Sequence, residues 1–247
     1  MTAAPAGAAQ SYWRASRAHR YSLLFALPLL VTYELLAAML SGPTGGVRNG
    51  ADVLLKSAFV WLAGVYGPLL FGAVIIGVAV WLVVRDIRAA GATLRVPVFL
   101  TMLGESVVLA VLFGMVVGTL TAQLLGSLAA LSITPIEQMS WWTRLMLSLG
   151  AGLYEELLFR VLLVSALLFI ARRIIGRGFA AGAVAAAGGA LIFSAFHYIG
   201  PYADALQLQS FVFRFIAGLA FSALFIVRGF GITAWTHALY DVFLMAV

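Results

Sequence analysis

Long apolar runs, separated by short polar segments, fill most of the 247-residue chain. A helix rises about 1.5 Å per residue, so about 20 apolar residues cross the roughly 30 Å hydrocarbon core of a bilayer. The run 53–84 is longer than one crossing and contains the breaker pair Gly67-Pro68, so we expect an interfacial helix followed by one span. The pattern predicts an all-α, polytopic transmembrane helical bundle of seven or eight spans. The apolar runs cover residues 21–40, 53–84, 97–130, 143–170, 179–199, 208–227 and 230–246.

The composition supports a membrane protein and excludes several chemistries. With 64% hydrophobic and only 10% charged residues, and a mean hydropathy of +1.07, the chain is too apolar for a soluble globule. The net charge of +6 does not indicate a nucleic-acid partner, because the arginines lie between apolar runs and form no basic stripe. Membrane lipids are the expected surroundings. The chain has no cysteine, which excludes disulfides, thiol nucleophiles, Cys-ligated zinc and Fe–S clusters.

The order of the segments predicts one membrane domain. Residues 1–20 form a polar N-terminal lead, and residues 21–247 form a single membrane domain without a soluble insertion. The first apolar run is long for the hydrophobic part of a signal peptide, which favours a retained span over a cleaved signal. Lys and Arg concentrate on alternate connections, so the positive-inside rule predicts a multi-pass protein of the cell membrane with a cytoplasmic N-terminus and, for seven spans, an outer C-terminus. The basic side carries Arg14, Arg17, Arg20, Arg85, Arg88, Arg95, Arg172, Arg173, Arg177 and Arg228, and the opposite side carries Arg48, Lys56 and Arg144.

Three charged residues interrupt the apolar run from Leu145 to Ile170, namely Glu155, Glu156 and Arg160. Each charge at the centre of a spanning helix costs about 2.5 to 3.5 kcal/mol, so the helix inserts well only if the charges pair, lose protons or face a wet cavity. Glu156 and Arg160 are four residues apart and can form an ion pair on one helical face. Glu155 points about 100° away and can act as a general base in a separate cavity. The alternative is a structural polar cluster that holds helices together.

Two later spans add two histidines and an aspartate. Phe193 and His197 are four residues apart and share a helical face, as do His237 and Asp241. A histidine that only binds a backbone carbonyl is the structural alternative for His197. Water activation by Glu155 with His197, and oxyanion stabilisation by His237 and Asp241, would satisfy the requirements of peptide hydrolysis.

The motifs EExxxR at Glu155 to Arg160, FxxxH at Phe193 to His197 and HxxxD at His237 to Asp241 resemble those of the CPBP intramembrane glutamic peptidases. That family includes the type II CAAX prenyl endopeptidases and the bacteriocin-processing, self-immunity and abortive-infection membrane proteins. The resemblance covers the motif-bearing catalytic core, about residues 141–247, while residues 1–140 resemble it only as generic spans.

The resemblance implies a metal-independent, all-helical membrane protease that needs no cofactor. Glu155 and His197 would activate water, and His237 and Asp241 would stabilise the oxyanion. Supporting roles would fall to Glu156, Arg160 and Phe193.

The resemblance also implies a partner, and it is imperfect at one position. The expected substrate is a membrane-tethered peptide or protein that is lipidated or carries a C-terminal sorting segment. The predicted topology puts Glu155 and His197 nearer the outer leaflet, which favours sorting or export processing over cytosolic CAAX trimming.

Prenyl endopeptidases usually have Asn where this chain has Asp241. An ionised Asp cannot donate to an oxyanion, so Asp241 is either protonated or orients His237.

Other functions compete with this hypothesis. A zinc peptidase would use Glu155, His197 and His237 with a water as fourth ligand, although the chain has no HExxH motif. Tyr240-Asp241 resembles the YD of aspartyl intramembrane proteases but lacks a GxGD partner, and a rhomboid-type serine site lacks its GxSG. From a different class, the chain would be a non-catalytic peptide-binding, immunity, scaffold or transport protein.

Three further charged residues lie inside apolar runs. We expect Glu34 and Glu105 to hydrogen-bond neighbouring helices rather than to line a substrate cavity. Arg214 would pair with one of these acids or bind a substrate carboxylate.

Overall fold

The structure, a computed structural model, describes residues 6–41, 46–91, 93–125, 139–200 and 203–245. Within these ranges the regular secondary structure is helical and no strand is present, which confirms the all-α class. The run 97–130 is helical as far as Leu125, and its last residues lie outside the described ranges. The helices are α1 (Ala6–Arg17), α2 (His19–Leu40), α3 (Gly50–Ala63), α4 (Gly67–Ala90), α5 (Val96–Leu125), α6 (Trp141–Gly150), a π-helix (Ala151–Val164), α7 (Ser165–Ile174), α8 (Phe179–Phe196), α9 (Leu208–Arg228) and α10 (Phe230–Met245).

The helices of the described residues support a multi-pass membrane bundle. Five segments are long and apolar enough to cross a membrane, namely α2, the stretch that contains α3 and α4, α5, α8 and α9. The continuous helix from Trp141 to Ile174 and the 16-residue α10 come in addition to these five. These elements correspond to the seven predicted spans. An eighth span is not formed by α3, because its 14 residues are too few to cross the hydrocarbon core.

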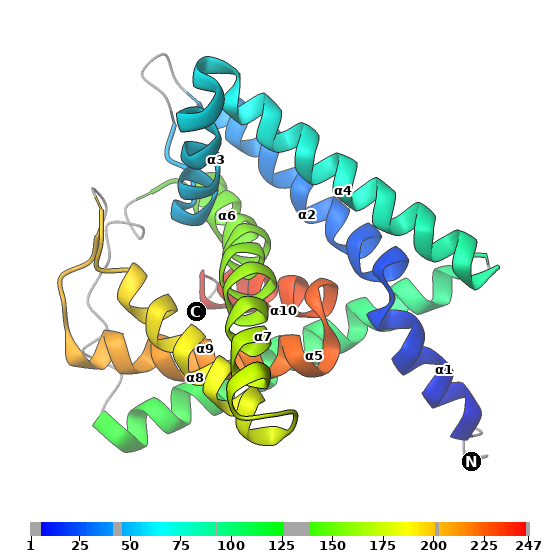
Figure 1. Cartoon of the computed structure of the whole chain (residues 1–247). Helices are drawn as coiled ribbons and strands as arrows, with labels where there is room; N and C mark the ends of the chain where they lie inside the picture. Colours follow the sequence, from blue (N-terminus) through cyan, green and yellow to red (C-terminus); the bar gives the residue numbers. More distant parts are fainter. Residues whose placement is uncertain (1–5, 42–45, 92, 126–138, 201–202, 246–247) are drawn as a thin grey trace.

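The long apolar run 53–84 is divided near Gly67-Pro68, as the sequence predicts. The first helix, α3, ends at Gly64, whose φ of +56° is one that glycine adopts more easily than other residues. A short 3₁₀ turn follows, and α4 then begins with proline in its first turn, where a missing N–H costs nothing. Figure 1 shows α3 as a short separate helix beside one end of the long α4. The expected short helix followed by one long helix is therefore confirmed, while its interfacial position stays a prediction.

The helix that carries Glu155 and Glu156 changes its winding where these residues lie. It is α-helical in α6, π-helical from Ala151 to Val164, and α-helical again in α7. At the end of the π-helix the Ser165 N–H donates to the carbonyl of Arg160, five residues earlier. The sequence predicted ordinary helical spacing over this run. Glycines near its start weaken the α-helical preference, and π-turns are frequent at functional sites.

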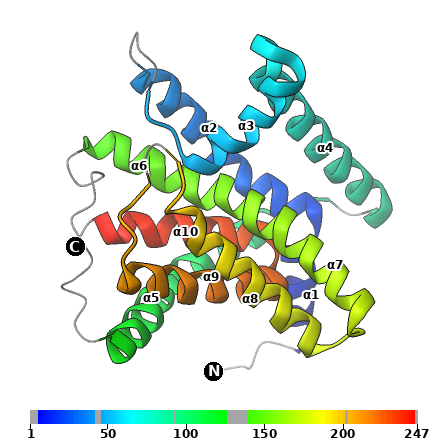
Figure 2. The ribbon, with the colours of Figure 1, turned by 60° about the vertical axis from the view of Figure 1, so that its left-hand side comes forward.

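The core of the bundle lies around α10. Figure 2 shows α10 running between α6 and α9, and α10 also packs against the π-helix, α2 and α5. Its small residues Ala234 and Ala238 belong to one buried cluster with α2, α6 and the π-helix, whereas Tyr240 belongs to a second cluster with α5 and α9. One helix thus contributes to both of these clusters, and it carries His237 between Ala234 and Tyr240.

Residues of the predicted polar lead form α1, which packs on the membrane helices. Arg228, at the end of α9, is only 3% exposed and binds both carboxylate oxygens of Glu105 on α5, at 2.5 and 2.7 Å. The Arg228 guanidinium also lies 3.9 Å from the ring centroid of Trp13. The Tyr12 hydroxyl donates to the same Glu105 carboxylate. Glu105 therefore binds neighbouring helices, as expected, and it anchors α1.

The π-helix lies so close to α10 at Gly152 that this position does not tolerate a larger side chain. A Cβ at Gly152 would lie 2.4 Å from the carbonyl oxygen of Ala234, which is too close for any side chain. We predict that Gly152→Ala lowers the free energy of unfolding by about 1–3 kcal/mol, because the core must move to accept it. Thermal unfolding of the purified protein in detergent would measure this change.

The matched control is Gly104→Ala on α5, where a Cβ would meet nothing within 4 Å. This variant should be neutral or more stable, because alanine favours a helix over glycine by about 0.5–1 kcal/mol. Equal stability of the two variants would contradict the close packing of the π-helix on α10.

Candidate active site

The two neighbouring glutamates point into different surroundings. Glu156 is fully buried, and its Oε1 lies 2.6 Å from His237 Nδ1 and 3.3 Å from a guanidinium nitrogen of Arg160. Glu155 accepts a hydrogen bond of 2.8 Å from the Asn49 side-chain amide. The predicted ion pair of Glu156 with Arg160 is present, and Glu155 faces a separate group of side chains. The bond of Glu156 to His237 and that of Glu155 to Asn49 were not predicted.

His237 is fixed on α10 by a carboxylate on one side and an aromatic ring on another. Its Nδ1 faces Glu156, and its ring stacks on Phe221 at 4.3 Å between centroids. Its other nitrogen, Nε2, lies 3.7 Å from the carboxylate of Asp241, which is beyond a direct hydrogen bond. Because an ionised carboxylate can only accept, the Glu156 contact places a proton on Nδ1. The orientation of Nε2 is therefore set by Glu156.

Arg160 is the largest fully buried side chain of the described residues. Its guanidinium faces Glu156 and lies 4.4 Å from the ring centroid of Phe193 and 5.5 Å from that of Phe221. A cation over an aromatic face in a water-poor site gains roughly 2 kcal/mol. Phe193 of the FxxxH motif is thus in contact with both Arg160 and the ring of His197, which lies 4.9 Å away.

His197 lies at the C-terminal end of α8. Its Nδ1 is 3.0 Å from the carbonyl oxygen of Phe193. Since a carbonyl oxygen only accepts, Nδ1 carries the proton of the neutral ring, and Nε2 is left as a base. This is the backbone bond expected of a purely structural histidine, but it also gives the tautomer that a general base requires.

Three elements bring the predicted residues together. The charge of Glu155 on the π-helix interacts with His197 at the end of α8 and with His237 on α10. His237 interacts in turn with Asp241 and with both glutamates. Sequence spacing placed these residues only on helical faces, and the packing of the helices brings them together. We call this group the polar cluster; it consists of Glu155, Glu156, His197, His237 and Asp241.

The zinc hypothesis finds no assembled ligand set. In the part of the chain that the structure describes, no group of three or more His, Asp or Glu side chains is arranged to hold a metal ion. The metal independence of the site stays a prediction.

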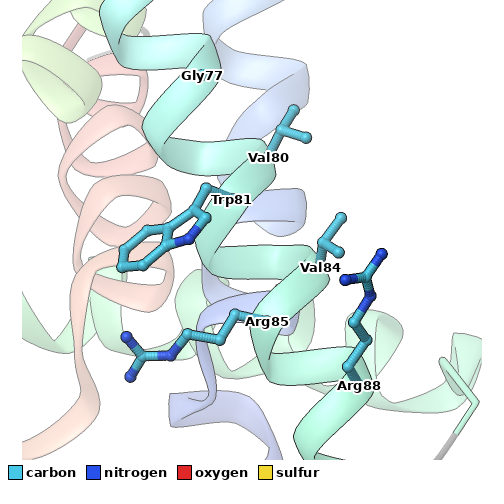
Figure 3. Close-up of a pocket in the computed structure, with 6 residues that line it drawn as sticks. All are labelled: Gly77, Val80, Trp81, Val84, Arg85 and Arg88. Atoms are coloured by element: carbon cyan, nitrogen blue, oxygen red, sulfur yellow. The ribbon is translucent and has the colours of Figure 1, made fainter.

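A hollow on α4 lies away from the polar cluster. It has a volume of about 420 Å³ and follows one face of the helix, where the guanidinium of Arg85 lies 5.2 Å from the ring centroid of Trp81 (Figure 3). A tryptophan beside arginines at the end of an apolar helix is typical of a membrane interface. The hollow carries none of the predicted site residues. Its lining is Gly77, Val80, Trp81, Val84, Arg85 and Arg88.

A charged cluster next to Glu155 was also missed by the sequence reasoning. Glu34 on α2 accepts hydrogen bonds from Lys56, at 2.8 Å, and from the Tyr154 hydroxyl, at 2.5 Å. It also pairs with Arg48, which in turn pairs with Asp52 at 2.7 Å. Burial lowers the pKa of Arg48, but the charges of Asp52 and Glu34 raise it by more, so Arg48 stays protonated. Glu34 therefore binds neighbouring helices, as the sequence analysis favoured.

Arg214 has a different partner from the one predicted. Instead of Glu34 or Glu105, it pairs with Asp204, in the connection before α9. It also binds the hydroxyl of Tyr198 at 3.0 Å. The predicted pairing with Glu34 or Glu105 is wrong, because Asp204, which is close in sequence, pairs with the guanidinium instead.

Comparison with known families gives a match over the same region. Residues 137–243 match the family model described as type II CAAX prenyl endopeptidase Rce1-like. Neither the curated proteins nor the solved structures contain a match to this chain. The matched range includes all three motifs and every residue of the polar cluster. Over this range, which is less than half of the chain, the protein is similar to the type II CAAX prenyl endopeptidases of the CPBP/CAAX protease family.

Proposed function

We propose that this protein is a metal-independent intramembrane glutamic endopeptidase that hydrolyses a peptide bond of a membrane-associated or lipidated substrate. The observation that carries the proposal is the separation of the two glutamates. Glu156 is bound by His237 and Arg160, while Glu155 interacts with His197, whose Nε2 is available as a base. One carboxylate is thus structural and the other is able to react.

Glu155 and His197 activate the attacking water in this mechanism. One of them takes a proton from water as its oxygen attacks the substrate carbonyl carbon, and the proton later passes to the leaving amine. The bond of His197 Nδ1 to the Phe193 carbonyl keeps Nε2 directed away from the α8 backbone. Phe193 therefore supports the site by holding both the tautomer and the ring.

His237 stabilises the oxyanion that forms on the substrate carbonyl. With Nδ1–H donating to Glu156, Nε2 can donate a second hydrogen bond only when the ring is an imidazolium. The negative charge of Glu156 favours that charged form. Arg160 balances the charge of Glu156 in its buried place.

The first test is cleavage of a panel of lipidated and unlipidated membrane-tethered peptides by purified protein. Glu155→Gln should lower kcat by about 10²- to 10⁴-fold, because the amide keeps the shape of the side chain but cannot accept a proton. Glu155→Ala should be equally inactive. A fully active Glu155→Gln protein would contradict the glutamic mechanism, and a wild type that binds the peptides without cutting them would favour the peptide-binding or immunity role.

Asp241 gives a second test, because its two proposed roles respond differently to amidation. An Asn side chain can donate to the oxyanion but carries no charge. We predict that Asp241→Asn keeps kcat within about 10-fold of wild type, whereas Asp241→Ala loses about 10²-fold, as expected for a lost oxyanion donor. Equal losses in both variants would show that the Asp241 charge is needed instead.

We also propose that the N-terminus is cytoplasmic in the cell membrane and that residues 21–247 form one membrane domain. Contacts between the basic connections support their assignment to one side of the membrane. Arg20 binds Asp86, and Arg17 donates to the carbonyl of Ile226. These segments meet at one end of α2, and Glu34 with its partners lies toward the other end. With a cytoplasmic N-terminus, Glu155 would lie nearer the outer leaflet, and this supports a substrate with a C-terminal sorting segment.

A reporter fused after the last residue measures this orientation. The prediction is an alkaline phosphatase fusion that is active outside the cytoplasm, since an odd number of spans separates the two termini. An active cytoplasmic reporter at the same position would reverse the topology and the expected side of the site.

A further inference from the structure

Asn49, which lies just before α3, uses both ends of its side-chain amide. Its Oδ1 accepts from the Ala51 N–H at 2.9 Å and so caps α3. Its Nδ2 donates to Glu155 Oε1 at 2.8 Å. Among the residues that commonly cap helices, asparagine alone combines this acceptor with an N–H₂ donor, since Ser, Thr and Asp have no amide. The residue type therefore fits two tasks at once.

The position of Asn49 is fixed by its surroundings. The residue is 6% exposed, and its backbone N–H donates to the hydroxyl of Tyr33 at 3.2 Å. That hydroxyl donates in turn to the buried carboxylate of Asp52 at 2.8 Å. A Cβ at Gly150 would lie 2.9 Å from the Cβ of Asn49 and 2.5 Å from the ring of Tyr33. Asn49 and Tyr33 thus pack directly on the backbone that leads into the π-helix.

Ion pairs hold the first turns of α3 against α2 and the π-helix. Lys56 binds Asp52 at 2.7 Å and Glu34 at 2.8 Å, and Arg48 binds the same two acids. Glu34 also accepts from Tyr154, the residue before Glu155. This charged cluster, which consists of Glu34, Arg48, Asp52 and Lys56, therefore ties Asn49 to the segment of the π-helix that it contacts.

The start of α3 also lies beside the end of α8. A Cβ at Gly50 would lie 3.5 Å from the ring of Phe196, the residue before His197. The positive end of the 14-residue α3 thus lies close both to Glu155 and to the helix end that carries His197. The side chains of His197, His237 and Arg160 act electrostatically on Glu155, and Asn49 adds a neutral donor.

We propose that Asn49 is a positioning residue for Glu155, which its side-chain amide holds in the orientation needed to share a water with His197. The proposal rests on the proposed role of Glu155 as a base. It assigns a part in the reaction to a residue outside the range 137–243 that the family model matches. The charged cluster supplies the rigidity, and the amide supplies the contact.

Two substitutions separate the donor from the helix cap. Asn49→Ser and Asn49→Asp both keep an oxygen that caps α3, and neither can donate from Nδ2. We expect both variants to unfold thermally as wild type does and to keep KM within about 2-fold. We expect kcat to fall by about 10- to 100-fold, as is usual when a group that orients a reacting side chain is removed. A purely structural role would change stability but would not separate kcat from KM.

The controls distinguish a failure of this proposal from a failure of the proposed function. If wild type does not cleave, or if Glu155→Gln cleaves as well as wild type, the proposed function and this inference both fall. If cleavage depends on Glu155 but both Asn49 variants keep the wild-type kcat, only the positioning role is overturned. A loss of kcat confined to Asn49→Asp would attribute the effect to the added charge. Unfolding of both variants would show that Asn49 is structural. Either result also overturns the positioning role of Asn49.

Discussion

The contact of the Glu156 carboxylate with His237 and Arg160 is the constraint on which the rest of the site depends. A fully buried carboxylate is too costly in an apolar interior unless its charge is matched and hydrogen-bonded. His237 provides a hydrogen bond at 2.6 Å, and Arg160 provides an opposite charge at 3.3 Å. Because His237 belongs to α10, the same contact joins the π-helix to the helix at the centre of the core.

Several features follow from the need to keep these helices close. Gly152 allows the π-helix to approach the backbone of α10, and the ring of Phe221 stacks on that of His237. With Glu156 bound in this way, its neighbour Glu155 is directed toward Asn49 and His197. Glu155 and Glu156 are adjacent and chemically identical, but the fold gives them different partners. We propose that this difference is the basis of catalysis.

The sequence predicted the parts of this arrangement that depend on local geometry. Helical spacing placed Glu156 with Arg160, Phe193 with His197, and His237 with Asp241, and these pairs are in contact or close in the structure. The apolar runs predicted the helices, and the Gly67-Pro68 pair predicted where the long run divides. Each of these features depends on residues within a few positions of one another, which is the range over which periodicity carries information.

The features that were missed depend on packing between distant segments. Asn49 and Glu155 are 106 residues apart, and Glu156 and His237 are 81 apart, so no local pattern links them. The sequence of residues 48–52 does show a helix cap at Asn49, but it does not show what else the amide reaches. The π-helical winding was missed because the spacing of the apolar residues does not distinguish it from an α-helix, and the Asp204 partner of Arg214 was missed because it lies in an irregular connection. The domain division and the roles of the site residues stay predictions.

In the proposed mechanism, the polar cluster hydrolyses a peptide bond without a metal ion. Single-turnover cleavage of a membrane-tethered peptide tests this directly, with protein that has been stripped with chelator and whose zinc content is determined on the same sample. The mechanism predicts a wild-type rate in metal-free protein and no increase when zinc is added back. A rate that falls with the metal content and returns with zinc would contradict it and would favour a zinc peptidase built on Glu155, His197 and His237.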